Sequence, residues 1–109
     1  MKIRKDKYLS ERGGTAKIIK VLCMKCGRQL LIYQKDGSGW LKRLYLNRII
    51  SPEKYSNLQK DPQIKGEKGL KKLICECGEI IGIPIKHKDG RLAFHLIRSK
   101  FKRANLNKQ

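Results

Sequence analysis

The four cysteines of this chain occur as two close pairs, and this feature constrains the fold more than any other. In each pair a glycine directly follows the second thiol, and glycine accepts the positive φ that a tight turn around one ion requires. We therefore expect two thiol turns that meet in the folded protein. The first turn holds Cys23, Cys26 and Gly27, and the second holds Cys75, Cys77 and Gly78.

The sequences around the two turns also resemble each other. Residues 22–32 align with residues 74–83 when one residue is dropped between the second pair of thiols. Both segments have apolar residues before and after the turn, in a pattern that favours strands. The chain therefore carries an internal half-repeat of strand, thiol turn and strand.

Four thiolates complete the tetrahedral shell of a structural zinc ion, and two turns that each supply two thiolates form the zinc-ribbon arrangement. Disulfides are typical of secreted chains, whereas this one begins with charged residues and has no apolar signal segment behind them. An iron centre and a redox dithiol pair stay open as alternatives. His87 and His95 are not needed, because four thiolates fill the shell. The predicted zinc ligands are Cys23, Cys26, Cys75 and Cys77.

The charge of the chain points to a polyanionic partner. It has 27 Lys and Arg residues against 9 Asp and Glu residues, a formal net charge of +18. Self-repulsion on this scale opposes compaction, so we expect nucleic acid to bind. The alternative is a solvated, lysine-rich surface that keeps the protein soluble. No apolar run approaches the roughly 18 residues that span a bilayer, so we expect a cytoplasmic protein with no membrane partner.

Composition divides the chain into three parts. Residues 1–15 mix charges with two glycines and show no helical or strand period, which predicts a flexible basic arm. Residues 16–98 are the expected zinc-ribbon domain, with an insertion at 51–69. Residues 99–109 are a predicted basic tail.

Hydrophobic patterning predicts a mainly β fold. Strands are expected over 16–22, 29–34, 70–74, 79–86 and 91–98, and in the last of these Leu92, Phe94 and Leu96 should face the core while Ala93 and His95 face outward. The segment 35–39 predicts a hairpin, as does 87–90. Residues 40–50 fit a helix or a strand, and we favour a strand because a hairpin precedes them.

A helix start is marked in the insertion by Ser51 as N-cap, Pro52 at the first helical position and Glu53 in the first turn. This predicts a short helix from Pro52 to about Gln59. The expected fold class is therefore mainly β, or small α+β. It consists of zinc-ribbon or β-tent-like antiparallel sheets, stapled by one four-cysteine zinc, with one short helix in the insertion.

The sequence offers little for catalysis. A closed four-thiolate site has no open position for water or substrate, and neither a phosphate-cradling loop nor a serine nucleophile elbow is present. We therefore expect a non-enzymatic protein without a small-molecule substrate. Trp40 stands beside Lys42 and Arg43, and an aromatic plane next to cations suits a splayed base. The candidate nucleic-acid contacts are Arg28, Lys35, Trp40, Lys42, Arg43, Arg48, Arg91, Arg98, Lys100, Lys102 and Arg103.

The sequence favours RNA over DNA as the partner. No segment predicts a long basic helix for the major groove, and the helix-turn-helix pattern is absent. A small stapled sheet with basic ends suits a structured RNA, such as that of the ribosome. The two alternatives are a small DNA-binding transcriptional regulator and a β-tent pocket that binds a small ligand or a peptide end.

The thiol turns and their glycines resemble those of zinc-ribbon proteins, including ribbon-type ribosomal proteins and small phage translational regulators. The chain also resembles the Yippee-like β-tent proteins, in which two distant thiol turns, separated by a long β-rich insertion, share one zinc. The spacing of Cys75 and Cys77 differs from the Cys-x-x-Cys of that family. Both resemblances imply a structural zinc and a mainly β domain.

Overall fold

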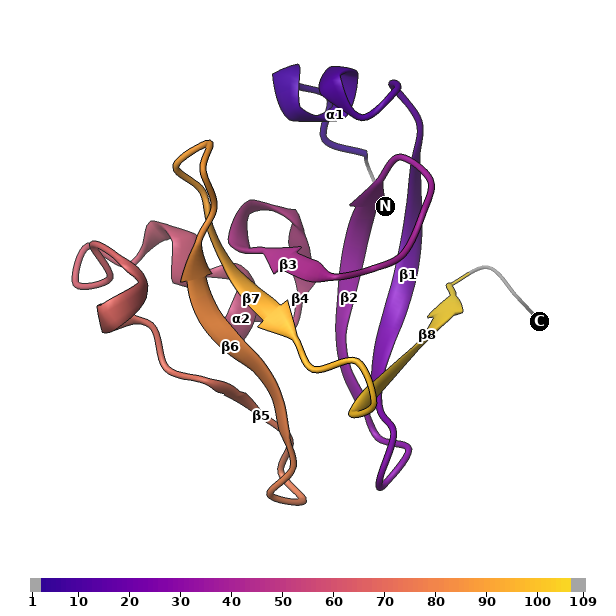
Figure 1. The fold of residues 1–109 in the computed structure, drawn as a ribbon, viewed down its shortest axis with the longest axis vertical. Helices are drawn as coiled ribbons and strands as arrows, with labels where there is room; N and C mark the ends of the chain where they lie inside the picture. The colour runs from indigo at the N-terminus through magenta and orange to yellow at the C-terminus, as the bar shows by residue number, and fades with distance from the viewer. Residues whose placement is uncertain (1–2, 107–109) are drawn as a thin grey trace.

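The computed structural model describes residues 3–106, which form two four-stranded antiparallel sheets (Figure 1). The first sheet has the strand order β4-β2-β1-β8, and the second has the order β3-β7-β6-β5. The predicted mainly β class, with two antiparallel sheets and a short helix in the insertion, is confirmed. The strands are β1 (Ala16–Cys23), β2 (Gln29–Asp36), β3 (Arg43–Tyr45), β4 (Ile49–Ser51), β5 (Leu73–Ile74), β6 (Ile80–Lys86), β7 (Leu92–Leu96) and β8 (Phe101–Asn105).

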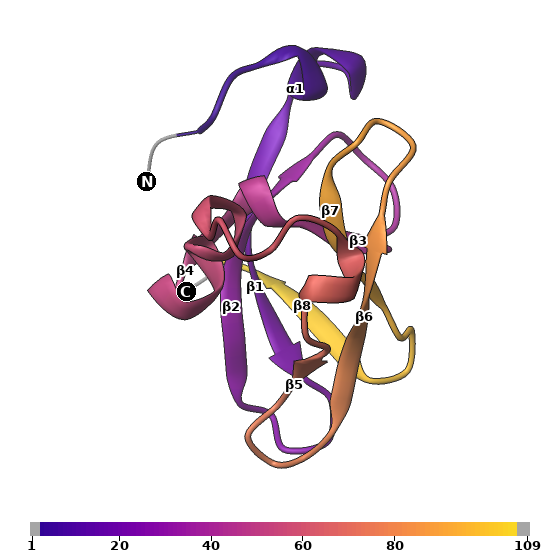
Figure 2. The ribbon, with the colours of Figure 1, turned by 90° about the vertical axis from the view of Figure 1, so that its left-hand side faces the viewer.

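The hydrophobic core lies between the two sheets, which face each other in Figures 1 and 2. In the first sheet, Ile19 on β1 is paired with Tyr33 on β2, and Val21 is paired with Leu31. Cross-strand partners point to the same side of a sheet, so these four side chains form one buried face. Side chains from the second sheet complete the core: Leu44, Leu73, Ile81, Phe94 and Leu96.

Strand β7 follows the predicted alternation except at one position. Phe94 and Leu96 are buried and His95 is exposed, as expected. Ala93 was predicted to face outward, but it is fully buried. Its neighbours in register are Tyr45 on β3 and Ile85 on β6, and their larger side chains stand on the same face on either side of its methyl group.

The prediction of a single strand over residues 40–50 is wrong, because this segment crosses from one sheet to the other. Strand β3 pairs with β7 in the second sheet, a 3₁₀ turn follows over Leu46–Arg48, and β4 then pairs with β2 in the first sheet. Residues 35–39 are therefore not a hairpin between paired strands. Gly37 has a φ of 74° and donates its N–H to the carbonyl of Thr15, which turns the chain away from β1.

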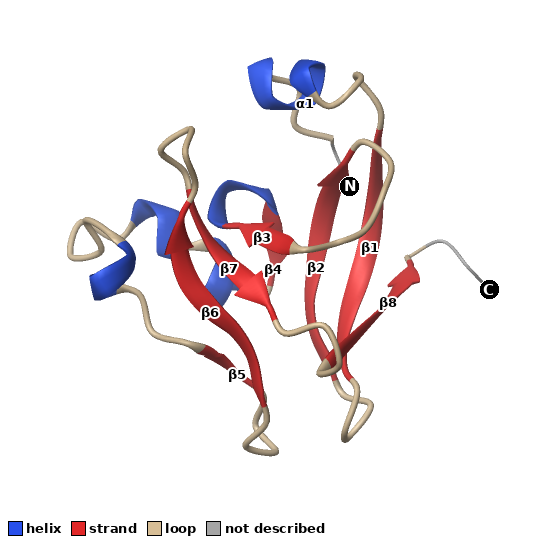
Figure 3. Ribbon diagram, viewed as in Figure 1, coloured by secondary structure: helices blue, strands red, loops and turns tan. Residues whose placement is uncertain are grey.

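The insertion is less helical than predicted (Figure 3). Ser51 is not an N-cap, because it is the last residue of β4 and pairs with Ile32. Pro52, which follows a cis peptide bond, takes the N-cap position of α2 (Glu53–Ser56). A 3₁₀ turn over Leu58–Lys60 replaces the expected extension to Gln59, and a second 3₁₀ turn follows over Glu67–Gly69.

The two ends of the chain are more ordered than the sequence predicted. Helix α1 (Lys7–Glu11) lies in the expected flexible arm, where the Asp6 carboxylate caps it and Leu9 is buried. Strand β8 lies in the expected tail and pairs with β1 from Cys23 opposite Phe101 to Ile19 opposite Asn105. The outermost residues of the two predicted segments, 1–2 and 107–109, lie outside the described residues. No helix in the described range 3–106 has the length and apolar character needed to cross a membrane.

Candidate metal centre and basic surfaces

The two thiol turns come from different sheets. The first connects β1 to β2, and the second connects β5 to β6; both lie at the lower end of the molecule in Figure 1. Each sheet therefore supplies two cysteines to one cluster. An ion bound by all four would join the sheets to each other at this end.

The four sulfur atoms lie within 4.8 Å of one another. The Sγ atoms of Cys23 and Cys77 are 3.7 Å apart, and those of Cys26 and Cys75 are 3.5 Å apart. A tetrahedral site with metal–sulfur bonds of about 2.3 Å has edges of about 3.8 Å, so the separations fit such a site. None of the four cysteines forms a disulfide. The predicted ligand set is thus positioned to hold one metal ion.

Backbone groups shape the thiol turns. Gly27 and Gly78 have φ values of 77° and 97°, the conformation for which glycine was predicted at these positions. In the first turn the N–H of Gly27 donates to the carbonyl of Cys23, and the N–H of Arg28 donates to the sulfur of Cys26 at 3.4 Å. Hydrogen bonds from the backbone amides of Cys26 and Lys25 lower the pKa of Cys23 to about 7.

The neighbouring thiols favour the thiolate of Cys23 but oppose that of Cys75. The backbone amide of Cys77 favours the thiolate of Cys75, but burial and the neighbouring thiols outweigh it and raise the pKa of Cys75 to about 12. Four thiolates held this closely need a positive charge among them. A divalent cation at the centre of the cluster would supply that charge.

Two of the predicted nucleic-acid contacts, Arg28 and Lys100, lie beside the thiol cluster. Arg28 forms an ion pair with Glu76 at 3.0 Å, which links the two thiol turns across an exposed surface. Lys100 forms an ion pair with Glu79 at 3.3 Å, and its carbonyl accepts a hydrogen bond from the N–H of Met24. The Arg28–Glu76 pair is exposed and contributes little to stability, so Arg28 can exchange its partner for a phosphate.

Trp40 is the centre of an exposed basic patch that we call the Trp40 surface, made of Trp40, Lys42, Arg43 and Arg98. The Trp40 side chain is 73% exposed, and the Arg98 guanidinium lies over its ring at 4.7 Å from the centroid. Lys42 is held against β7 by a hydrogen bond from the N–H of Leu96 to its carbonyl. Its side chain and that of Arg98 are exposed, and Arg43 is half-buried. The structure therefore brings Arg98 onto Trp40, and Lys42 and Arg43 line one cavity with the same ring.

Two other predicted contacts are buried. Arg48 is 2% exposed, and its guanidinium is paired with Asp6 and Asp36, so it is not available to an external ligand. Lys35 is 5% exposed, and its Nζ donates to the carbonyl of Gly37 at 2.9 Å. Of the remaining three, Lys102 and Arg103 are exposed on β8 and point to opposite faces of the first sheet, opposite Leu22 and Val21.

Arg91 lies between two aromatic rings that the sequence did not single out as partners. Its guanidinium carbon is 3.8 Å from the centroid of Tyr8 and 3.8 Å from that of Tyr45, and Asp89 accepts a hydrogen bond from its Nε. Tyr8 comes from α1 and Tyr45 from β3. No sequence pattern could have revealed this stack, since the three residues are brought together only by the fold.

A cavity of about 530 Å³, which we call the inter-sheet cleft, lies next to this stack. Its walls come from α1, from the segment between β2 and β3, and from the turn between β6 and β7. In Figure 1 these elements lie at the upper end of the molecule, away from the thiol turns. Its lining includes Tyr8, Arg12, Lys35, Trp40, Tyr45 and Arg91.

Comparison of the chain with protein-family models, curated proteins and solved structures found no match. The assignment of a function therefore depends on the geometry of this chain alone.

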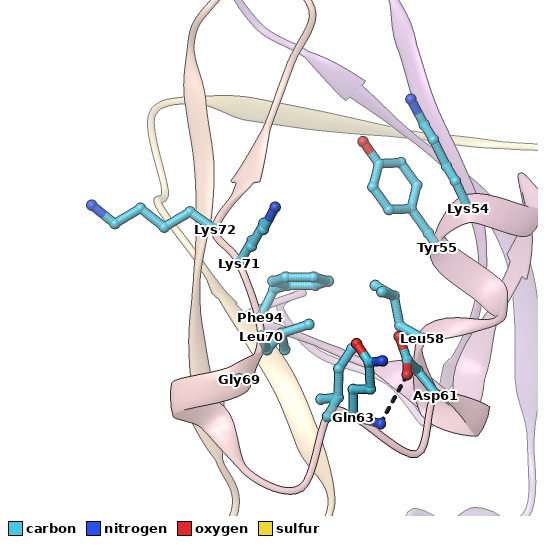
Figure 4. Close-up of a pocket in the computed structure, with 11 residues that line it drawn as sticks. Lys54, Tyr55, Leu58, Asp61, Gln63, Gly69, Leu70, Lys71, Lys72 and Phe94 are labelled. Atoms are coloured by element: carbon cyan, nitrogen blue, oxygen red, sulfur yellow. Dashed lines mark hydrogen bonds between the residues drawn. The ribbon is translucent and has the colours of Figure 1, made fainter.

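A second cavity, of about 540 Å³, lies between the insertion and β7. Figure 4 shows Phe94, Leu58 and Tyr55 around it, with Lys54 and Lys71 reaching to its upper edge. Asp61 stabilises its lower wall by accepting a hydrogen bond from the N–H of Gln63 at 2.9 Å. The cavity thus has an apolar interior and a cationic rim.

Proposed function

We propose that this protein is a non-enzymatic, zinc-stapled RNA-binding protein. The observation that carries the proposal is the Trp40 surface, where an exposed indole ring is stacked with a guanidinium and flanked by further cations. In the free protein, a tryptophan that is exposed to this degree leaves most of its apolar surface in contact with water. A base stacked on the ring, with its phosphates on the neighbouring cations, would use both features.

The metal that we propose for the thiol cluster is zinc. Four thiolates at tetrahedral separations suit Zn²⁺ or a single iron ion, and the arrangement leaves no coordination position for a substrate. The ion would have a structural role, which is to hold the two sheets together. This supports a binding protein rather than an enzyme.

RNA is favoured over duplex DNA by the lengths of the helices. Within residues 3–106 the α-helices contain five and four residues, which is too short for a recognition helix in a major groove. Structured RNA exposes unstacked bases that an aromatic side chain can reach. With a net charge of +18, the protein suits an RNA-rich assembly such as the ribosome.

The test is a binding titration of the zinc-loaded protein with a labelled structured RNA over a salt series. A variant with Lys42→Gln and Arg98→Gln removes two charges from the Trp40 surface. The matched control, Lys65→Gln with Lys68→Gln, removes two exposed charges from the insertion, which lies on the opposite side of the molecule from β8 (Figures 1 and 2). Because both variants have the same net charge, a difference between them reports position.

We expect the Trp40-surface variant to bind RNA at least tenfold more weakly than the control and to have a smaller salt slope, by about 2 for two lost phosphate contacts. Equal binding by the two variants would show that the attraction is non-specific. A clear preference for one duplex DNA sequence over RNA would instead support a transcriptional regulator. Sequencing the RNA that co-purifies from cells tests association with the ribosome.

A second candidate function is the binding of a small ligand, and the cavity in Figure 4 favours it. Phe94, Leu58 and Tyr55 would contact an apolar body, and Lys54 and Lys71 would neutralise an acidic group, so the ligand class is an amphipathic carboxylate. Addition of decanoate or phenylacetate should raise the melting temperature of the wild-type protein. The rise should be smaller for Lys71→Gln and unchanged for Arg43→Gln. No shift with any such acid would rule out this function.

A further inference from the structure

Lys35 is a buried cation without a counter-ion in the described part of the chain. Its Nζ carries three N–H groups, yet its one hydrogen bond within residues 3–106 is to the carbonyl of Gly37. No ion pair of these residues includes Lys35, and the adjacent Asp36 is bound to Arg48 and Gln34. A buried ammonium group is ordinarily paired with a carboxylate, so this one is an exception that needs a cause.

Several neighbours of Lys35 are also positively charged. Lys17 on β1 is its direct partner in register, and like charges in this position destabilise a sheet. Burial lowers the pKa of Lys35, and the charges of Arg103, Arg12 and Lys17 lower it further. Asp36 opposes this effect only in part, so three basic residues from three other segments act on Lys35, and an anion beside it would offset their charge.

The inter-sheet cleft gives such an anion access to Lys35. Lys35 and Arg12 line the cleft together, and Arg91 lines it from the opposite sheet. The guanidinium of Arg91 cannot swing freely, because Tyr8 and Tyr45 hold it on both faces at 3.8 Å. Its Nε donates to Asp89 and its Nη1 donates to Asn47, and the N–H groups that remain are held in place for a planar or tetrahedral anion.

The same cleft has an aromatic edge. Trp40 belongs both to its lining and to the Trp40 surface, so a ligand in the cleft can reach the indole ring. A phosphate group would match the cations, and a flat base would match the ring. Nucleotides combine these two groups, and a cavity of about 530 Å³ has room for one of them.

We propose that the inter-sheet cleft is a nucleotide-binding site, in which a phosphate is bound by Lys35, Arg12 and Arg91 and the base stacks on Trp40. This inference rests on the proposed function where the nucleotide is part of an RNA strand, such as a looped-out residue or a strand end. A free mononucleotide has the same chemistry, and the two sources are separated by experiment.

The test uses the full-length, zinc-loaded protein and calorimetric titration with AMP, UMP, inorganic phosphate and a short single-stranded oligonucleotide. Lys35→Met keeps the length of the side chain and removes its charge. Because Lys35 has no counter-ion, this variant should melt at the same temperature as the wild type or higher. We expect it to bind nucleotides at least tenfold more weakly, whereas Lys68→Met should bind them as the wild type does.

The possible results distinguish failure of the nucleotide-binding site from failure of the proposed RNA-binding function. Equal nucleotide binding by Lys35→Met and wild type would overturn the proposal, and Arg12→Gln gives the same test should the first variant not fold. Structured RNA and mononucleotides that both bind normally to Lys35→Met would overturn the site and leave the proposed function intact. Mononucleotides that bind through Lys35, with no binding of any RNA, would support the site and overturn the function. Equal affinity for phosphate and nucleotide would overturn the role of the base.

Discussion

Arg48 and Asp6 are joined by two hydrogen bonds, one from Nη1 to Oδ2 at 3.0 Å and one from Nη2 to Oδ1 at 2.6 Å. The Nε of Arg48 also donates to Asp36 at 2.8 Å. The Asp6 carboxylate accepts the N–H groups of Tyr8 and Leu9 at the start of α1 as well. One buried guanidinium thus connects the N-terminal segment to β2 and to the turn between β3 and β4.

Asp6→Asn should destabilise the protein by about 2–3 kcal/mol, because it removes one of the two carboxylates that neutralise the buried charge of Arg48, while Asp36 remains. The asparagine oxygen still accepts the helix N–H groups, so the substitution separates the ion pair from the cap. Urea unfolding measures the loss. Asp61→Asn is the control, since that carboxylate is exposed and caps only a turn. A loss no larger than that of the control would show that Asp36 alone neutralises Arg48.

The contribution of this pair should depend on pH. A hydrogen bond from the Arg48 side chain lowers the pKa of Asp6 from 3.8 to about 2. A carboxyl group with a lowered pKa stabilises the folded state fully above its unfolded pKa and stops doing so as the pH falls through its folded pKa. The stability difference between wild type and Asp6→Asn should therefore be constant from pH 7 to about 4 and shrink from 4 toward 2. A difference that already falls between pH 7 and 5 would contradict this assignment.

Removal of the metal should unfold the protein. Structural zinc contributes roughly 10–16 kcal/mol to small finger peptides, about as much as the 5–15 kcal/mol net stability of a whole domain. Treatment with a chelator should abolish the cooperative melting transition seen by circular dichroism, and added zinc should restore it. Cys77→Ser should behave like the chelated protein, whereas Ser99→Ala should not. An unchanged transition after complete metal loss would mean that the sheets hold together without an ion.

Trp40→Ala and Arg98→Gln should weaken RNA binding in different ways. Loss of the indole should cost about 1–3 kcal/mol of binding free energy without changing the salt slope, because no charge is removed. Loss of the guanidinium should reduce the salt slope by about 1. Neither substitution should alter the melting temperature, since both side chains are exposed. A lower melting temperature for Trp40→Ala would indicate that the ring is a packing residue.

Two glycines of the segment between β2 and β3 should respond unequally to alanine. A Cβ at Gly37 would lie 2.6 Å from the carbonyl oxygen of Arg12, whereas a Cβ at Gly39 would meet nothing within 4 Å. Both have positive φ, so each substitution costs about 1–2 kcal/mol of backbone strain. Gly37→Ala should lose more stability than Gly39→Ala in urea unfolding. Equal losses would mean that the contact with Arg12 relaxes at no cost.

The features that the sequence predicted well are those set by neighbouring residues. The two thiol turns depend on closely spaced cysteines followed by Gly27 and Gly78, and strand β7 depends on local alternation. The metal ligands were therefore identifiable before the fold was known. The predicted nucleic-acid contacts were chosen by charge, and charge alone does not say which way a side chain points.

The features that the sequence missed depend on partners distant in the chain. Arg48 is buried because it pairs with Asp6, which lies 42 positions away in the chain. Lys35 is buried because β2 continues past the core toward α1, and Arg91 stacks on tyrosines from two other elements. The crossing of residues 40–51 between the sheets was also missed, since each short strand there pairs with a strand remote in sequence.

The division of the four thiols between two sheets has a consequence for how the chain reaches its native state. Either turn could bind an ion through its two thiolates, with solvent completing the shell, while the rest of the chain is still unfolded. The second pair of thiols, 49 to 54 positions away, then finds the first by replacing solvent ligands on an ion already in place. Metal–sulfur bonds would then offset part of the entropy that is lost in closing that loop. The ion would thus act as a folding template whose concentration sets the rate at which the two halves of the protein dock.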